Sequence, residues 1–214
     1  MMMNALHASI VLAVCALVVG CEPAQQQPQQ EQQPQAEARP PAPGVVIDSL
    51  GMGAARVGMT LGELRAALPA GTRVGALDSL FMVDLVALPV MAGADTLYHL
   101  VFPAGGNIGD TTTLAMVVTS NPTVKTRAGV GPGMTARDAA LVYGEPTFAY
   151  NINDESREYA TFAGYPARNV RFRIVPNGDA LFVGKYDTTA EYNETRDFDP
   201  AGRIFMVMVD LRSR

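Results

Sequence analysis

A short motif that occurs twice decides the expected fold, GMTLGEL at residues 58–64 and GMTARDA at residues 133–139. In the first copy, Thr60 and Glu63 have the spacing of a capping box. In such a box the Thr hydroxyl accepts a hydrogen bond from the N3 amide, and the Glu carboxylate accepts one from the N-cap amide. In the second copy, Thr135 and Asp138 take the same places, and the shorter Asp makes a weaker box. Each copy therefore predicts the start of a helix.

Both predicted helices are short, because Pro69 stops the first, and Gly144 followed by Pro146 stops the second. Helices of about two turns persist only when they pack against other elements. The alternation from Val170 to Ile174 predicts a strand with one buried face, whereas the apolar run from Ile204 to Val209 predicts a central strand. The full set of expected strands is 80–88, 96–102 and 113–119 after the first helix, and 158–162, 169–175, 180–183 and 203–209 after the second.

The order of these elements predicts an α+β fold. We expect two tandem repeats, each a short capped helix (or helix pair) followed by an antiparallel sheet of three to four strands. The first repeat would occupy residues 44–125 and the second residues 126–214.

Residues 1–20 are expected to be a lipoprotein signal peptide. The stretch from Ala8 to Gly20 is apolar and uncharged, and it is too short for a bilayer span, which takes about 20 apolar residues. It suits the apolar region of a secretory signal. The sequence Val18-Val19-Gly20-Cys21 resembles the bacterial lipobox. This resemblance implies cleavage between Gly20 and Cys21 and a lipid on the Cys21 thiol. Three methionines at the start leave the true start codon open.

The segment 21–43 is rich in Gln and Pro and has almost no large apolar side chains. Such a segment has too little apolar surface to offset its ordering entropy, and its prolines favour extended chain. We predict a disordered tether between the lipid and the folded part.

A family resemblance rests on three features. These are the Gly-Met-Thr-x-x-[Glu/Asp] starts, the Tyr143-Gly144-Glu145-Pro146 helix end and the lipoprotein signal. Together they resemble the BamE/SmpA (OmlA) family of small envelope lipoproteins, and the tandem β-lactamase-inhibitor-protein fold is similar. The resemblance covers most of residues 50–214 and implies fold more than function. The first copy departs from it, with LPAG at residues 68–71 where the second copy has YGEP.

Few residues point to catalysis or metal binding. His99 is the single histidine after the predicted signal, so a zinc site would lack its usual His and Cys ligands. The glycine-rich run 129–133 lacks the lysine of a phosphate-binding loop. The acidic segment 185–202 does not have the spacing of a calcium-binding loop, and we interpret it as a solvated insertion. The sequence thus predicts a non-enzyme without a cofactor other than the lipid on Cys21.

Partner binding is the function that remains. The chain has a net charge of −5 and no dense Lys/Arg cluster, which argues against nucleic acid. Tyrosine buries much area with few torsions and is favoured in interfaces. The candidate interaction residues are Tyr150, Tyr159, Tyr165, Tyr186, Tyr192 and Phe198.

We therefore expect a lipid-anchored envelope protein, in the outer membrane and facing the periplasm, that acts as a non-enzymatic protein-interaction module. By resemblance, its partner would be part of an envelope assembly machinery or an envelope enzyme that it inhibits. Two alternatives stay open: a small-ligand carrier or carboxylate-dependent enzyme on the sheet face, and a structural envelope-stabilising lipoprotein. The oligomeric state and the choice between inner and outer membrane are open as well.

Overall fold

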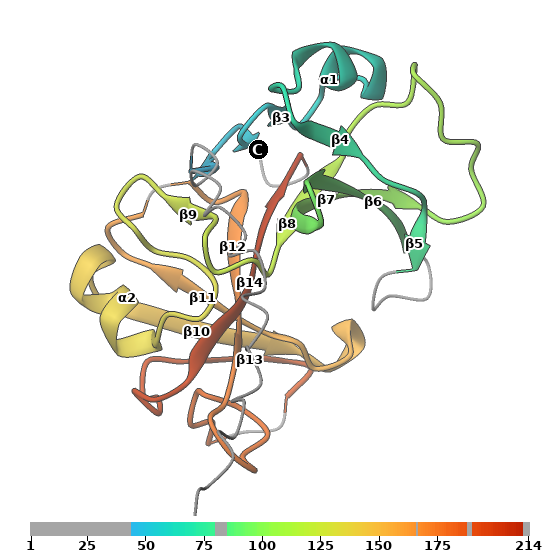
Figure 1. Cartoon of the computed structure of the whole chain (residues 1–214). Helices are drawn as coiled ribbons and strands as arrows, with labels where there is room; N and C mark the ends of the chain where they lie inside the picture. The colour runs from blue at the N-terminus through green and yellow to red at the C-terminus, as the bar shows by residue number, and fades with distance from the viewer. Residues whose placement is uncertain (1–43, 80–84, 166, 188–189, 212–214) are drawn as a thin grey trace, which may run out of the picture. The chain divides into compact units, whose positions relative to one another are not determined.

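A computed structural model describes residues 44–79, 85–165, 167–187 and 190–211 (Figure 1), and these residues belong to one compact unit. The expected signal peptide, the lipid site at Cys21 and the tether up to residue 43 lie outside the described residues. Within the described part, no helix has the length and apolar character needed to cross a bilayer.

The described chain consists mainly of strands. Its helices are α1 (Leu61–Ala67), α2 (Ala136–Tyr143) and the 3-10 turn η1 (Ile152–Asp154). The strands of the first part are β1 (Val46–Asp48), β2 (Gly51–Met52), β3 (Ala55–Arg56), β4 (Thr72–Val74), β5 (Asp78–Ser79), β6 (Leu85–Ala92), β7 (Asp95–Pro103), β8 (Met116–Thr119) and β9 (Lys125–Thr126). Those of the second part are β10 (Pro146–Asn151), β11 (Glu158–Phe162), β12 (Val170–Val175), β13 (Tyr192–Thr195) and β14 (Arg203–Asp210).

The predicted α+β fold of two helix-plus-sheet repeats is wrong, because the described chain is mostly β and its strands do not form one sheet per repeat. A small sheet has the order β3-β2-β1-β9. A large sheet has the order β13-β10-β11-β12-β14-β8-β7-β6-β4, and β5 also pairs with β6. The large sheet runs through both predicted repeats without a break.

The last strand, β14, explains the difference. It pairs on one side with β12 and on the other with β8, where Val207 lies opposite Thr119 and Val209 opposite Val117. The apolar run from Ile204 to Val209 was predicted to be a central strand. It is central in the single large sheet that both halves of the chain share. The pairing joins residues far apart in sequence, so no local pattern could reveal it.

The duplicated motif is nevertheless docked in the same way at both places. In each copy the N–H of the motif glycine donates a hydrogen bond of 2.8 Å to the carbonyl of a residue much later in the chain. The N–H of that later residue donates to the carbonyl of the motif methionine. The matching donors and acceptors are Gly58 to Leu114, Leu114 to Met59 and Leu61 to Thr112 in the first copy, and Gly133 to Ile204, Ile204 to Met134 and Ala136 to Gly202 in the second. The repeat thus applies to the helix starts and not to two separate sheets.

Helix capping and glycine conformation account for the motif. The Thr60 hydroxyl accepts from the Glu63 N–H (3.3 Å), and the Glu63 carboxylate accepts from the Thr60 N–H (2.7 Å). In the second copy the Thr135 hydroxyl accepts from the Asp138 N–H at 3.1 Å. Gly58 and Gly133 have φ of 93° and 86°, a region that residues with a side chain rarely adopt.

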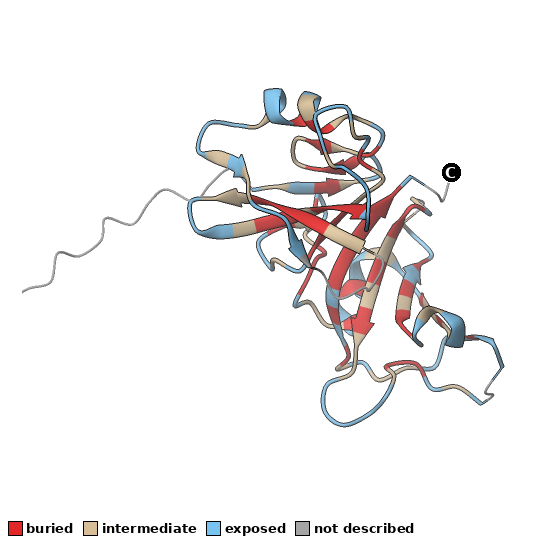
Figure 2. Cartoon of the chain, turned by 90° about the vertical axis from the view of Figure 1, so that its right-hand side faces the viewer, coloured by how far each residue is buried: buried red, intermediate tan, exposed pale blue. Residues whose placement is uncertain are grey.

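The two faces of the large sheet differ in what covers them. One face carries the main core, which includes Phe172, Leu100 and Val207 as well as Leu61 and Leu64 of α1 and Ala136 and Ala139 of α2. The opposite face carries a second cluster made only of strand residues, with Val101, Val118, Met206 and Met208 at its centre. Figure 2 shows the buried residues concentrated in the central strands. Both helices therefore pack on the same side of the sheet.

The first described residues already form part of the small sheet. β1 pairs in parallel with β9 and antiparallel with β2, and Ile47 at its centre is buried. Just after β1, the carbonyl of Ser49 accepts a hydrogen bond of 2.7 Å from the Asn169 side chain. The same Asn169 amide donates to the carbonyl of Asp210 at the end of β14. β1 is thus tied to both halves of the chain.

Candidate protein-binding face

The sheet face opposite the helices, which we call the open face, is lined by three rows of residues that lie opposite one another in register. Among the described residues, no helix packs on it. The first row is Glu194, Ala149, Tyr159, Arg173 and Met206. The second is Arg171, Met208, Val118, His99 and Pro89. The third is Asp210, Met116, Val101, Ala87 and Asp78.

Two arginines of β12 stand over aromatic rings on this face. The guanidinium carbon of Arg171 lies 4.9 Å from the centroid of the Tyr159 ring, and that of Arg173 lies 5.4 Å from the centroid of the Phe205 ring. Such contacts attract the cation to the face of the ring and fix the plane of the guanidinium. The open face therefore presents two oriented guanidinium groups beside an apolar centre.

The two arginines differ in their ion pairs. Arg171 Nη2 lies 3.0 Å from a carboxylate oxygen of Asp210, whose side chain is 6% exposed. Arg171 Nε is buried and has no hydrogen-bond partner among the residues that the structure describes. Arg173 pairs with no carboxylate among the described residues, and its guanidinium lies against the ring of Phe205. Among the described residues, one positive charge on the open face therefore has a carboxylate partner and the other has none.

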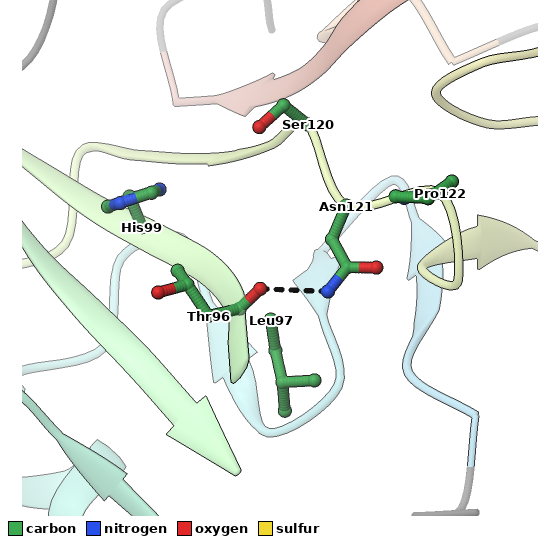
Figure 3. A pocket seen from close by; sticks show the side chains of 6 residues that line it. All are labelled: Thr96, Leu97, His99, Ser120, Asn121 and Pro122. Atoms are coloured by element: carbon green, nitrogen blue, oxygen red, sulfur yellow. Dashed lines mark hydrogen bonds between the residues drawn. The ribbon is translucent and has the colours of Figure 1, made fainter. Parts of the chain in front are cut away.

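A pocket of about 220 Å³ lies where β7 begins and β8 ends (Figure 3). The Asn121 side-chain amide donates to the Thr96 carbonyl at 2.8 Å, which holds the segment after β8 against β7. The lining residues are Thr96, Leu97, His99, Ser120, Asn121 and Pro122. None of these is an Asp, Glu, Lys or Arg, and the pocket is smaller than the roughly 300–1,000 Å³ of typical small-molecule sites.

His99 lines this pocket and also belongs to the second row of the open face. Burial lowers the pKa of His99 from its ordinary 6.5, and the nearby charge of Asp78 opposes that shift. Within the described residues His99 and Ser120 share no hydrogen bond.

The titration of His99 should make stability depend on pH. Because its pKa is lowered by folding, the folded protein binds this proton less tightly than the unfolded chain does. The stability from neutral His99 is complete above about pH 6.5 and is lost as the pH falls through that value toward the folded pKa. Urea unfolding of the wild type and His99→Gln at a series of pH values should show the wild type losing stability relative to the variant on acidification. Parallel curves would contradict this.

The six candidate aromatic residues do not gather in one place. Tyr159 and, by register, Tyr192 belong to the open face, and Tyr192 is 57% exposed. The other four pack toward the main core. Tyr165 contacts Tyr143 and Phe172, Phe198 stacks on Phe148, Tyr150 stacks on Phe182, and Tyr186 meets Tyr150 edge-on.

A buried carboxylate holds part of this aromatic group. Glu158 of β11 accepts hydrogen bonds from the N–H groups of Val183 and Gly184, both at 2.7 Å, and from the Tyr186 hydroxyl at 2.8 Å. Burial raises the pKa of Glu158, and the three hydrogen bonds oppose that shift. The expected strand at 180–183 is wrong, because these residues form no strand. The Val183 N–H donates to the Glu158 side chain, and the Val183 carbonyl accepts from the Asp199 N–H.

The acidic segment expected to be a solvated insertion contains the edge strand β13, which pairs with β10. Among the described residues, no group of three or more His, Cys, Asp or Glu side chains is placed to hold a metal ion.

Sequence reasoning missed the arginines and methionines of the open face. The strict alternation of Val170 to Ile174 did place Arg171 and Arg173 on one face of a strand, and that was the available signal. It could not show that the face lacks a helix, because this depends on where α1 and α2 pack.

Comparison with known proteins identifies no relative of this chain. The chain matches no protein-family model, no curated protein and no solved structure. The resemblance to the BamE/SmpA family therefore remains a hypothesis based on the quoted motifs.

Proposed function

We propose that this protein is a lipid-anchored, non-enzymatic protein of the cell envelope that binds a folded partner protein through the open face. The observation that carries the proposal is a sheet face with an apolar centre and no helix among the described residues to cover it. The four side chains of that centre are themselves only 1–3% exposed, and the accessible apolar residue beside them is Phe205, which is 37% exposed. The centre consists of Met206, Met208, Val101 and Val118.

The composition of the open face supports protein binding. Interfaces are enriched in Tyr, Met, Phe and Arg near their centre, and Arg and Tyr dominate the residues that contribute most to affinity. Tyr159, Arg171, Arg173 and Phe205 supply these types within three adjacent strands. The partner that fits is a folded protein presenting apolar side chains around a negatively charged group.

Site-specific photo-crosslinking in the intact native envelope tests the proposal. A photo-reactive amino acid at position 205 should crosslink to a distinct protein partner. The matched control is position 141 on α2, where Leu141 is 79% exposed but lies on the helix side. Position 141 should not give that product. Equal products from both positions, or none from position 205, would overturn the proposal.

The same preparation tests the anchor. The wild-type chain should partition into the membrane fraction with the acyl mass expected on Cys21, and Cys21→Ser should not. If the wild-type protein stays soluble and unacylated, the proposed lipid anchor is refuted. The crosslink at position 205 then still decides whether the protein binds a partner.

A further inference from the structure

We propose that the pocket beside His99 binds the phenol ring of a tyrosine on the protein that covers the open face (Figure 3). This role rests on the function proposed above and names one side chain that the partner contributes. Four features of the pocket support it: the way its wall is built, the hydrogen-bonding groups on that wall, its size and its place beside the open face.

The pocket forms at a β-bulge near the start of β7. Val90 of β6 lies opposite Tyr98, and the next residue, Met91, lies opposite Thr96. Leu97 is therefore an extra residue in β7 without a partner in β6. Bulges change the direction of the side chains around them and occur often beside functional sites.

Side chains from the end of β8 hold the bulge in place. The Thr119 hydroxyl donates to the Leu97 carbonyl at 2.7 Å, and the Asn121 side-chain amide donates to the Thr96 carbonyl at 2.8 Å. The Asn121 side-chain oxygen accepts from the N–H and the hydroxyl of Thr123, at 2.9 and 2.7 Å. Asn121 is thus bonded at both ends and fixes the wall of the pocket.

Three neutral side chains on the wall keep their hydrogen-bonding capacity. Among the described residues, the Thr96 and Ser120 hydroxyls and the His99 imidazole make no side-chain hydrogen bond. Each hydroxyl can donate and accept. Because burial lowers the pKa of His99 from its ordinary 6.5, the imidazole is neutral at pH 7 and offers one N–H donor and one nitrogen acceptor. The wall therefore suits a neutral group that both donates and accepts a hydrogen bond.

The size of the pocket selects the side chain. Its volume is about 220 Å³, and a cavity of about 150 Å³ already takes up benzene. A ring with a hydroxyl therefore fits, whereas the short Ser, Thr, Asn and Gln side chains would leave space. A Phe ring would cover the polar groups without pairing them, which is unfavourable, and a Trp N–H can only donate. Tyrosine both fills the pocket, against Leu97 and Pro122, and pairs its polar groups.

The pocket lies where a partner on the open face can reach it. Ser120 is exposed and directly follows Thr119, which lies opposite Val207 of β14. Phe205 is two residues before Val207, and the two strands are antiparallel, so Ser120 and Phe205 lie toward the same end of this pair. A partner in contact with Phe205 can therefore place a side chain in the pocket.

Titration of the ¹⁵N-labelled full-length protein with p-cresol, the tyrosine side chain without its backbone, tests the site. Millimolar p-cresol should shift the backbone amide signals of Leu97, Ser120 and Asn121 in a saturable way, and not that of Leu141 on α2. Toluene, which lacks the hydroxyl, should bind about fivefold more weakly, the effect of one hydrogen bond. Benzoate and benzylamine should also bind more weakly, because a neutral wall does not pair a charge. Equal binding of any of these three probes, or no saturable shift, would overturn the site.

The crosslink at position 205 separates failure of the site from failure of the proposed function. Ser120→Leu, which fills the pocket, should abolish the product while its circular dichroism spectrum stays that of the wild type. Ser120→Ala, which removes only the hydroxyl, should lower the yield. Ser49→Leu, at an exposed serine after β1, is the matched control and should leave the product unchanged.

Two outcomes divide the proposals. A product that persists at the wild-type yield in Ser120→Leu would overturn the tyrosine site and leave the proposed function. Saturable binding of p-cresol while position 205 gives no product in any variant would overturn the proposed function and leave the preference of the pocket for a phenol.

Discussion

Replacing Phe172 with alanine should lower the free energy of unfolding by about 3–5 kcal/mol, because the ring is lost from the middle of the main core. Phe172 is 1% exposed, and its ring meets those of Phe162 at 5.3 Å and Tyr165 at 5.6 Å. Small domains have total stabilities of about 5–15 kcal/mol, so this is a large share. Urea unfolding followed by circular dichroism measures the change.

Phe205→Ala is the matched control, since the same side chain is removed from the neighbouring strand β14 on the other face. Phe205 is 37% exposed, and its truncation should cost about 1 kcal/mol or less. If the two variants were destabilised equally, the assignment of the main core to the helix side of the sheet would be wrong.

Replacing Glu158 with alanine should also be strongly destabilising, by about 2–5 kcal/mol. The change removes the acceptor of two buried backbone N–H groups, Val183 and Gly184, and each unpaired buried donor costs about 1–3 kcal/mol. It also leaves the Tyr186 hydroxyl without its acceptor. The loss should be visible in urea unfolding and as faster proteolysis of the segment around residue 183.

The control for Glu158 is Glu194, a second carboxylate that accepts a hydrogen bond from a tyrosine hydroxyl. Its partner is Tyr192, and both lie at the surface. Glu194→Ala should change stability by no more than about 0.5 kcal/mol. If both variants lost a comparable free energy of unfolding, Glu158 would contribute no more to stability than the exposed Glu194 does.

Some of this structure could be predicted from local sequence. The capped helix starts depend on residues three positions apart, and Thr60 with Glu63 forms the expected box. The expected strand 158–162 has the bounds of β11. By contrast, strands of two or three residues such as β2, β3 and β5 are too short to show a period, and they were missed.

The arrangement of the sheet could not be predicted in the same way. Whether β14 pairs with β8 depends on contacts between residues about ninety positions apart, and a local pattern contains no information on them. The candidate aromatic residues illustrate the same limit. Tyr186 and Tyr192 flank the same polar stretch, residues 187–191, yet one lies against the buried Glu158 and the other is mostly exposed.

The position of β1 determines how mechanical load would pass through the protein. Any tension applied to the chain before residue 44 reaches the fold at β1, where the Val45 carbonyl is held by the Lys125 N–H and the Val46 carbonyl by the Gly53 N–H. Rupture there would expose Ile47 and release Ser49 from Asn169, the residue that also holds the end of β14. A pull from the N-terminus would therefore load, through Asn169, the backbone of Asp210, whose carboxylate pairs with Arg171 on the open face.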